Sequence, residues 1–563
     1  MSQLSQQPEY DVCIVGSGAG GGMAAYVLSK AGAKVALLEA GPEWYSTRDS
    51  KMLVPAYASP RRGAGSREKP FGEFDGCIGG WDIEGEPYTT APGTKFSWWR
   101  ARMLGGRTNH WGRISLRFGP DDFRGKSIDG LGDDWPIGYD DIKPYYDEID
   151  KLIGIFGSNE GLRNNPDGIF QPAPKPRCYE LMIKQACDKL DITCIPGRLS
   201  ILTRPLNGRM ACHYCGQCGR GCQTNSNFSS PGVLIKPALD TGKLTLITGA
   251  MAREVTIDKN GLATGVTYIR TKDGAEQHVR ARVVVLAASA FESARLMLNS
   301  KSSLFPHGLA NSSGIIGKYI TDTTGVGLSG FIPKMVNRMP HNEDGSGGNH
   351  IYMPWTKDNK KLDFPRGYHI EVGGGFDAPS YGFMGGIQRY PNAGGYGKSL
   401  KDDYRRYFGA TVGFAGRGEM IPSDDCYCEL DPKTVDKYGI PVLRFHWKWS
   451  DHEINQAKHA EKTFTAIIEA MGGKVIGPRG RKIGQSLENP GKIIHEVGGA
   501  IIGADPKKSV VNQWNQTWDV KNLFLNDGAP FASNADKNPT LTIMALAWRA
   551  CDYLSTEAKK GNL

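Results

Sequence analysis

Residues 10–41 decide the fold, and they read YDVCIVGSGAGGGMAAYVLSKAGAKVALLEAG. Tyr10 to Val15 alternates apolar and polar residues, Gly16 breaks the pattern, and Met23 to Lys30 has the apolar spacing of a helix. Lys34 to Leu38 predicts a second strand that ends at Glu39. Strand, glycine turn, helix and strand within about thirty residues are typical of the βαβ unit that opens a dinucleotide-binding domain.

The glycine turn carries a specific chemistry. Gly16, Gly18 and Gly21 have the G-x-G-x-x-G spacing, which permits a tight turn, close approach of the backbone to a pyrophosphate, and close packing of the helix. Glu39, at the end of the second strand, is placed to accept a hydrogen bond from a ribose hydroxyl. An ordinary glycine turn is the alternative, and the spacing does not separate FAD from NAD.

Length and charge limit the class of protein. A chain of 563 residues is long enough for two or more cores, because single cores stop growing near roughly 250 to 300 residues. The net charge of +9 is spread along the chain, so we expect no nucleic-acid partner. No stretch approaches the roughly 18 apolar residues of a membrane span, and the polar start from Met1 to Tyr10 has no signal-peptide pattern, so we expect no direct membrane anchor.

The cysteines are clustered. Four of the twelve form the series Cys212-x2-Cys215-x2-Cys218-x3-Cys222. Such short spacing is close to the run that holds iron–sulfur clusters in ferredoxins, and we favour a cluster over a structural zinc ion, which usually takes two separated C-x2-C pairs. Gln223 stands where the ferredoxin run has proline, so the number of iron atoms stays open.

Three further motifs contain reactive residue types. Arg102 to Gly112 includes the pair Gly105-Gly106, which permits close approach to a flat ligand. His495-Glu496 begins like a zinc-protease motif, but Gly499 stands where the second histidine is needed, which excludes that interpretation. Asn538 precedes the final helix. On its own, a lone histidine such as His495 is more often structural than catalytic.

The remaining chain predicts an α/β protein, α+β overall, with a Rossmann-like domain that is discontinuous in sequence. Helices are expected over Asp140–Phe156, Cys178–Leu190, Glu292–Asn299 and Asp451–Met471, and strands over Thr245–Ile257, Gly265–Arg270 and Val279–Leu286. Thr323 to Cys428 has a glycine- and aromatic-rich β pattern, which predicts a second, sheet-based domain. We assign residues 1–135, 200–322 and 490–563 to the nucleotide-binding domain and residues 136–199 and 323–489 to the substrate-binding domain.

Taken together, these motifs resemble the glucose-methanol-choline (GMC) oxidoreductases over nearly the whole chain. The resemblance implies an FAD-binding domain with a β-sheet substrate domain, and a C-terminal histidine and asparagine facing the flavin, here His495 and Asn538. It implies that the FAD-binding residues are Gly16, Gly18, Ala19, Gly21, Glu39, Ala40, Arg102, Gly105, Gly106, Asn109, His110, Val255, Ala287, Asp527, Gly528 and Thr540.

Within the family, the cysteine group is similar to that of the flavoprotein subunits of sugar and gluconate dehydrogenases, including glucoside 3-dehydrogenase. That likeness implies an iron–sulfur cluster, with 3Fe-4S favoured on Cys212, Cys218 and Cys222, and 4Fe-4S possible with Cys215. It also implies a carbohydrate substrate, a small chaperone-like subunit, a cytochrome c-type acceptor, and periplasmic placement through a partner's export, with cytoplasmic placement otherwise. His110 occupies the place where pyranose 2-oxidase attaches its flavin covalently.

The expected function is therefore oxidation of a substrate CH–OH group, with hydride passing to FAD and electrons leaving through the cluster. His495 is the expected base, and Asn538 is expected to hold the substrate oxygen. Two alternatives stay open: an oxidase that uses oxygen and has a structural zinc site, and a non-catalytic electron-transfer flavoprotein.

Overall fold

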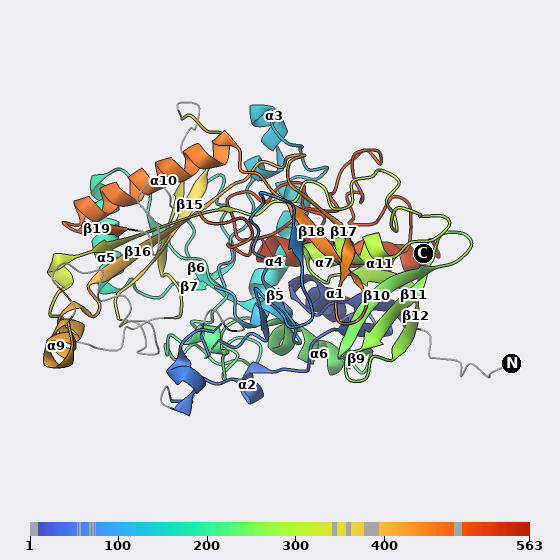
Figure 1. Ribbon diagram of the computed structural model, residues 1–563, viewed down its shortest axis with the longest axis horizontal. Helices are drawn as coiled ribbons and strands as arrows, with labels where there is room; N and C mark the ends of the chain where they lie inside the picture. The colour runs from blue at the N-terminus through green and yellow to red at the C-terminus, as the bar shows by residue number, and fades with distance from the viewer. Residues whose placement is uncertain are drawn as a thin grey trace.

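The computed structural model describes residues 10–52, 54–55, 58–66, 69, 72–73, 75–339, 346–355, 362–376, 393, 395–477 and 487–563. The parts of the predicted domains outside these ranges lie outside the described residues. Figure 1 shows two regions joined along the long axis: one contains α1, β9 to β12 and α11, and the other contains β15, β16 and β19 beneath α10. Each region has its own sheet, as expected for a nucleotide-binding region and a second, sheet-based region.

The first sheet is the dinucleotide-binding one. Its order is β10-β11-β12-β1-β2-β9, with β20 paired to β12. The pairings among its parallel strands join segments from both ends of the chain, which confirms a fold that is discontinuous in sequence. The strands are β1 (Tyr10–Val15), β2 (Val35–Glu39), β9 (Leu244–Thr248), β10 (Ala250–Ile257), β11 (Ala263–Arg270), β12 (Glu276–Leu286) and β20 (Leu523–Leu525).

Helices cover the faces of this sheet. The residues of α1 are mostly small or apolar, and its side chains are buried over most of its length. Helix α11 packs against both α1 and α4. The helices of this region are α1 (Ala19–Lys30), α4 (Tyr139–Ile153), α6 (Lys236–Leu239), α7 (Ala290–Asn299) and α11 (Thr540–Lys559).

The second sheet has the order β19-β13-β16-β15-β14-β8, and its pairings are antiparallel. Every second residue of β16 is buried, as expected for a sheet with one covered face. Helix α10 begins at Ser450, whose side chain caps it together with Glu453, and it packs on β13 and β16. The elements are β8 (Ile195–Pro196), β13 (Thr324–Phe331), β14 (Ile351–Trp355), β15 (Tyr368–Gly374), β16 (Thr411–Gly418), β19 (Lys474–Gly477) and α10 (Asp451–Ala470).

Short elements complete the fold. They include the small sheets β17-β18-β4, β3-β5 and β6-β7. Their bounds, with those of the remaining helices, are α2 (Ser46–Asp49), β3 (Gly79–Gly80), β4 (Thr89–Thr90), β5 (Arg100–Ala101), α3 (Gly125–Asp129), β6 (Ile155–Gly157), β7 (Phe170–Pro172), α5 (Cys178–Lys189), α9 (Gly397–Tyr407), β17 (Tyr427–Val435) and β18 (Pro441–His446).

One predicted strand is in fact two. The sequence predicts a single strand over Thr245–Ile257, but Gly249 has a φ of +64° and divides it into β9 and β10. A positive φ turns the chain out of the extended conformation, and glycine adopts it without steric cost. Consequently β9 pairs with β2 while β10 pairs with β11.

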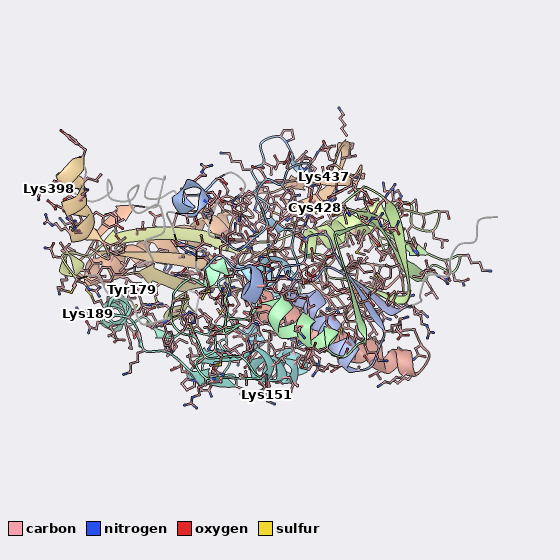
Figure 2. All side chains as sticks on the ribbon, turned by 90° about the horizontal axis from the view of Figure 1, so that it is seen from below. Lys151, Tyr179, Lys189, Lys398, Cys428 and Lys437 are labelled. Atoms are coloured by element: carbon pink, nitrogen blue, oxygen red, sulfur yellow. The ribbon has the colours of Figure 1, made fainter. Side chains whose placement is uncertain are left out.

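Two large hydrophobic cores follow the two sheets. The first core includes Ile142 and Tyr146 of α4 and Phe445 of β18, which come from segments that the sequence analysis assigned to the substrate-binding domain. The second core lies between the second sheet, α5 and α10. Figure 2 shows the labelled lysines Lys151, Lys189, Lys398 and Lys437 at the periphery, and all four are exposed. Among the described helices, none has the length and apolar character needed to cross a membrane.

Candidate active site

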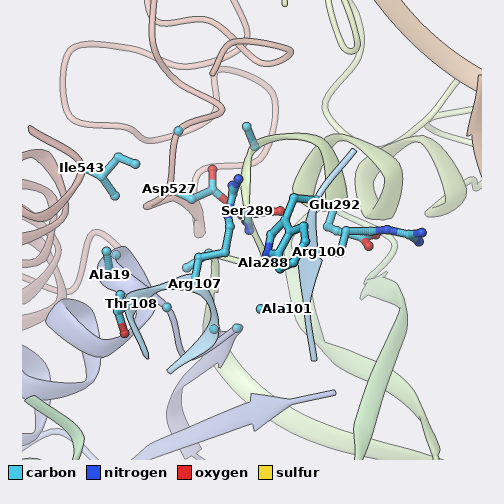
Figure 3. Close-up of a pocket in the computed structure, with 18 of the residues that line it drawn as sticks. Ala19, Arg100, Ala101, Arg107, Thr108, Ala288, Ser289, Glu292, Asp527 and Ile543 are labelled. Atoms are coloured by element: carbon cyan, nitrogen blue, oxygen red, sulfur yellow. Dashed lines mark hydrogen bonds between the residues drawn. The ribbon is translucent and has the colours of Figure 1, made fainter. Parts of the chain in front are cut away.

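A cavity of about 700 Å³ lies at the carboxyl ends of β1, β2 and β12. In open α/β sheets this edge is where ligands bind, and the volume is within the range of small-molecule and cofactor sites. Figure 3 shows that its wall combines α1 and the 100–108 segment with residues of the C-terminal part, such as Asp527 and Ile543.

Each glycine of the opening turn has a distinct structural role. Gly16 has a φ of +95°, and a Cβ there would lie 2.3 Å from the carbonyl oxygen of Ala287. A Cβ on Gly21 would lie 1.9 Å from the carbonyl oxygen of Gly16. A Cβ on Gly18 would meet nothing within 4 Å, because Gly18 faces the open cavity. Turn, helix packing and ligand approach are the roles that a pyrophosphate-binding turn assigns to these positions.

Glu39 lies on the cavity wall and is held in place by its neighbours. Its carboxylate accepts hydrogen bonds from the Ser17 hydroxyl and from the backbone N–H of Gly41, the latter at 2.8 Å. Ser17 Oγ in turn accepts the N–H of Gly105 at 2.8 Å, which ties the first turn to the Gly105-Gly106 pair. Burial raises the pKa of Glu39 above its usual value. A ribose hydroxyl is a partner that this carboxylate is placed to bind.

Buried cations form another part of the wall. Arg102 is paired with Glu86 at 2.8 Å and with Glu292. Arg100 is 3% exposed and stacks on Trp98, and within the described part of the chain its Nε and Nη2 have no hydrogen-bond partner. An unpartnered buried donor costs about 1–3 kcal/mol, so Arg100 is suited to a wall that faces an anionic ligand.

Asp527 is placed on the cavity wall by β20 and the turn that follows it. Its carboxylate accepts the Ser293 hydroxyl at 2.5 Å, the N–H of Ser289 at 3.1 Å and that of Ala529 at 2.8 Å. Burial raises the pKa of Asp527 to about 6, against these hydrogen bonds. Ser289 has a φ of +95°, a strained value for a residue with a side chain, and such strain is typical of binding sites.

His110 also faces the cavity. Its Nε2 lies 3.1 Å from Trp99 Nε1, which donates to it. Burial, together with Arg113 and Arg107, lowers the pKa of His110 to about 3, so the imidazole is neutral. Side-chain atoms of Asp75, Cys77 and His110 lie within 4.8 Å of one another, on the side of the cavity nearest the cysteine series.

His495 and Asn538 meet on the same cavity wall, although 43 residues separate them. Asn538 Nδ2 lies 3.1 Å from His495 Nε2 and 3.3 Å from Glu371 Oε1. On the other side of the ring, His495 Nδ1 lies 3.0 Å from Thr323 Oγ1. The two predicted catalytic residues are therefore one hydrogen-bonded unit.

Electrostatics keeps this histidine neutral. Burial lowers the pKa of His495 to about 3, Arg417 adds to the effect, and Glu371 opposes it. The backbone of His495 is fixed by Asp322, whose carboxylate accepts the N–H groups of His495, Ile493 and Thr323 at 2.8–3.2 Å. A neutral imidazole held in one place has a lone pair that can accept a proton, and a pKa of about 3 means that it holds this proton only weakly.

The cysteine series forms a loop beside the cavity. Gly76 donates its N–H to the carbonyl oxygen of Gly219 at 2.8 Å, so the loop lies against the segment that contains Asp75, a residue of the cavity wall. Cys222 accepts hydrogen bonds from the Thr224 hydroxyl and from nearby backbone N–H groups, and these outweigh burial and lower its pKa.

The spacing of the thiols bears on the zinc alternative alone. A single zinc ion with Zn–S bonds of about 2.3 Å holds its sulfurs roughly 3.8 Å apart. In the described part of the chain, no three of the four sulfurs of Cys212, Cys215, Cys218 and Cys222 lie within 4.8 Å of one another. The loop as folded does not form a cage for one zinc ion.

Most sequence-predicted residues meet at the cavity: Gly16, Gly18, Ala19, Glu39, Ala40, Arg102, Gly106, His110, Ala287, His495, Asp527, Gly528, Asn538 and Thr540. Gly21 supports the turn from behind, and Gly105 packs on Pro231. Asn109 is buried behind the wall, where its Nδ2 donates to the carbonyl of Leu104 at 2.8 Å.

Val255 is the fourth predicted residue, after Gly21, Gly105 and Asn109, that is not part of the cavity wall. It is buried in the first core. The register of β10 shifts between Ala252 and Glu254, and the strand reaches the cavity with Ala250, Met251 and Ala252 instead. The sequence gives no sign of this shift.

Several residues of the site were not predicted from the sequence: Ser17, Arg107, Ser289, Thr323 and Glu371. Ser17 lies inside the glycine motif and could have been found there. Thr323 lies directly before β13 and Glu371 lies on β15 of the second sheet, and only the folded chain brings them to His495 and Asn538.

Comparison with known proteins identifies the family. Residues 20–322 match the N-terminal region of the GMC oxidoreductases, and residues 422–547 match the C-terminal region. The chain belongs to the GMC oxidoreductases. Members of this family are flavoproteins that act on CH–OH groups.

Individual relatives cover almost the whole chain. The sequence is 32% identical to 2-methyl-1,2-propanediol dehydrogenase from Mycolicibacterium austroafricanum, over 97% of this chain and 95% of that protein. It is 26% identical to the fructose dehydrogenase large subunit from Gluconobacter japonicus, over 98% of each. The fold is similar to that of pyridoxine 4-oxidase from Mesorbium loti, with a TM-score of 0.64 at 17% identity, over 97% of this chain and 99% of that one.

The cavity fits the FAD that the family binds. The open Cα face of Gly18, the Glu39 carboxylate and the Arg100 side chain, whose Nε and Nη2 have no hydrogen-bond partner among the described residues, are groups that a dinucleotide would contact. His495 and Asn538 lie on the same wall, where they could face the flavin ring of a bound FAD.

Proposed function

We propose that this protein is an FAD-dependent dehydrogenase that oxidises a CH–OH group of a polyhydroxylated alcohol, either a sugar or a short vicinal diol, and that an iron–sulfur cluster receives the electrons. The observation that carries the proposal is the hydrogen-bonded pair of His495 and Asn538 on the wall of the cavity that contains the glycine turn.

The chemistry needs a proton acceptor and a hydride acceptor. FAD, when bound, supplies the hydride acceptor. His495 Nε2 takes the hydroxyl proton, because the buried ring is neutral and its Nδ1 side is occupied by Thr323. The Asn538 N–H that points at His495 Nε2 in the structure would turn to the substrate oxygen when the hydroxyl enters, and it would hold that oxygen beside the imidazole.

The substrate class rests on two lines of support. The two relatives described above are named for a 1,2-diol and for fructose, which both have adjacent hydroxyl groups. Asn538 Oδ1 is buried and has no hydrogen-bond partner in the described part of the chain, and a second substrate hydroxyl is a donor that would satisfy it. Propane-1,2-diol should therefore be a better substrate than propan-1-ol, measured as kcat/KM.

The iron–sulfur cluster is proposed on the cysteine loop, with Cys212, Cys218 and Cys222 as ligands of a 3Fe-4S cluster, and with Cys215 as a fourth ligand of a 4Fe-4S cluster. A cluster, when bound, accepts electrons one at a time. Its negative charge would be offset by Arg113, which is 1% exposed and has no hydrogen-bond partner at Nε among the described residues. Burial lowers the pKa of Arg113, and negative charge on Cys218, Cys222 and Asp75 opposes that effect.

The decisive experiment combines metal analysis with substrate-dependent reduction. Protein prepared without oxygen should contain about three or four iron atoms and matching acid-labile sulfide per chain. Anaerobic addition of a panel of diols, fructose, glucose, gluconate and a glucoside should bleach the flavin absorbance with at least one of them. Flavin without iron, combined with rapid hydrogen peroxide formation, would instead show an oxidase. No bleaching with any alcohol would indicate a non-catalytic flavoprotein.

Cys215 separates the two kinds of cluster. Cys215→Ser should keep its iron and its electron paramagnetic resonance signal if the cluster is 3Fe-4S, and should lose one iron if it is 4Fe-4S. Cys178→Ser, an exposed cysteine on α5, is the matched control and should match the unmodified protein. Unchanged iron in both Cys215→Ser and Cys222→Ser would exclude the proposed ligand set.

The resemblance of the cysteine group to that of sugar and gluconate dehydrogenase flavoprotein subunits supports further proposals about partners. We propose a small chaperone-like subunit, a c-type cytochrome as the electron acceptor, and periplasmic placement through the export of that subunit. Copurification with the product of a neighbouring gene tests them. Covalent attachment of FAD at His110 is proposed on its position in the cavity wall, and yellow colour that stays with acid-precipitated protein tests it.

A further inference from the structure

Glu371 contacts the catalytic pair from the second sheet. It lies on β15, and its Oε1 accepts a hydrogen bond from Asn538 Nδ2 at 3.3 Å. Arg417, on the adjacent β16, lies 3.1 Å from Glu371 Oε2, and His369 Nε2 lies 3.2 Å from Oε1. Two side chains of the same sheet therefore hold the carboxylate against Asn538.

The charge of Glu371 is maintained although the group is buried. Burial alone would raise its pKa, but Arg417 and then the hydrogen bond from His369 outweigh burial and hold the pKa below its ordinary value. A carboxylate only accepts hydrogen bonds, so the side of Asn538 that faces it must be the NH₂ group. The charge thus fixes which way the amide points.

The orientation of the amide determines which nitrogen of His495 carries the proton. The second N–H of the same NH₂ group points at His495 Nε2, 3.1 Å away. Nε2 must then be the bare nitrogen of the neutral ring, and the ring proton must be on Nδ1, where Thr323 Oγ1 accepts it at 3.0 Å. In this orientation Asn538 Oδ1 faces neither Glu371 nor His495, and it has no hydrogen-bond partner among the residues that the structure describes.

We propose that Glu371 is a positioning residue that acts through Asn538 to keep His495 in the tautomer with a bare Nε2, the form able to take a proton from the substrate hydroxyl. The inference rests on the proposed function, because it concerns the base of that reaction. Glu371 itself contacts neither the substrate hydroxyl nor the cofactor in this account.

The tautomer is directly measurable. In protein labelled with ¹⁵N-histidine, long-range ¹H–¹⁵N spectra distinguish a bare Nε2 from a protonated one, and His495→Gln identifies the signal. We expect a bare Nε2 in the unmodified holoenzyme. In Glu371→Gln the neutral side chain no longer dictates the amide orientation, and we expect a substantial fraction of protonated Nε2.

The kinetic arm uses the same variant. We expect kcat of Glu371→Gln to fall on the order of tenfold to a hundredfold, with KM changed less than about threefold, because Glu371 itself does not contact the substrate. Glu371→Asp retains the charge and should restore part of the lost kcat. Glu429→Gln, at an exposed glutamate on β17, is the matched control and should change neither quantity.

Two outcomes would overturn the inference. One is a protonated Nε2 in the unmodified protein, and the other is an unchanged His495 spectrum in a folded Glu371→Gln variant. If no alcohol is oxidised by the unmodified protein, the proposed function fails, whereas the spectrum of His495 still reports on the role of Glu371.

Discussion

The two ends of the cavity are built in different ways. The dinucleotide end is formed by Gly16, Gly18 and Glu39, which one βαβ unit of about thirty residues brings together. The reaction end is formed by Thr323, Glu371, His495 and Asn538, which come from four separate segments. Binding of the cofactor is thus encoded locally, whereas the catalytic geometry depends on how the two sheets pack together. Variants at one end should leave the function of the other end intact.

The largest difference in effect between the two ends of the cavity is expected from His495→Ala. Removal of the general base should slow substrate-dependent flavin reduction on the order of a thousandfold, as measured by anaerobic stopped-flow absorbance. FAD content should be unchanged, because the dinucleotide end is untouched. His446→Ala, on β18 and away from the cavity, is the control. Flavin reduction at the normal rate in His495→Ala would remove the base assignment.

A substitution in the cysteine loop should slow the transfer of electrons out of the protein without slowing the reaction in the cavity. Cys218→Ser should lower turnover with a one-electron acceptor such as ferricyanide by about a hundredfold or more, because the proposed cluster loses a ligand. The first flavin reduction by substrate should proceed at its normal rate. Equal loss of both rates would mean that the loop supports the fold and not electron transfer.

At the dinucleotide end, Gly18→Ala should weaken FAD binding by about tenfold, equivalent to about 1.4 kcal/mol, since the added methyl group projects into the cavity. The measurement is fluorescence titration of apoprotein with FAD. Gly373→Ala is a matched control, because a Cβ there also meets nothing within 4 Å but lies outside the cavity. Equal affinities in the two variants would contradict the proposed position of the pyrophosphate.

The smallest effect concerns Asp322, which fixes the backbone at the reaction end. Burial and then Glu496 raise its pKa to about 7. A folded pKa above the unfolded value of about 4 stabilises the fold below pH 4, and this contribution is lost as the pH rises through 7. The unfolding temperature should therefore decrease from pH 5 to pH 8, and in Asp322→Asn the decrease should be smaller by a few degrees. An identical pH dependence in both proteins would contradict the raised pKa.

The contrast between the two ends explains how much of the site could be predicted. Residues such as Gly16 and Glu39 follow from a short motif with fixed spacing, so their positions in the fold could be predicted from the sequence. His495 and Asn538 could be named only through the family resemblance. Glu371 could not be found, because its role depends on the antiparallel register that places β15 beside Arg417 of β16. Val255 was expected to bind FAD only through the family resemblance, and in the structure it is buried in the first core and is not part of the cavity wall.

The three hydrogen bonds accepted by Asp322 have a mechanical consequence. Thr321 pairs with Val497, and Asp322 accepts the N–H groups of Ile493 and His495, so the loop of His495 is joined to the chain just before Thr324, where β13 begins. Strand β13 pairs with β16, which contains Arg417, and Glu371 lies on the next strand, β15. The imidazole and the carboxylate that holds Asn538 are therefore attached to one sheet. A shift of that sheet relative to the dinucleotide-binding sheet would carry the two groups together and leave their relative positions unchanged.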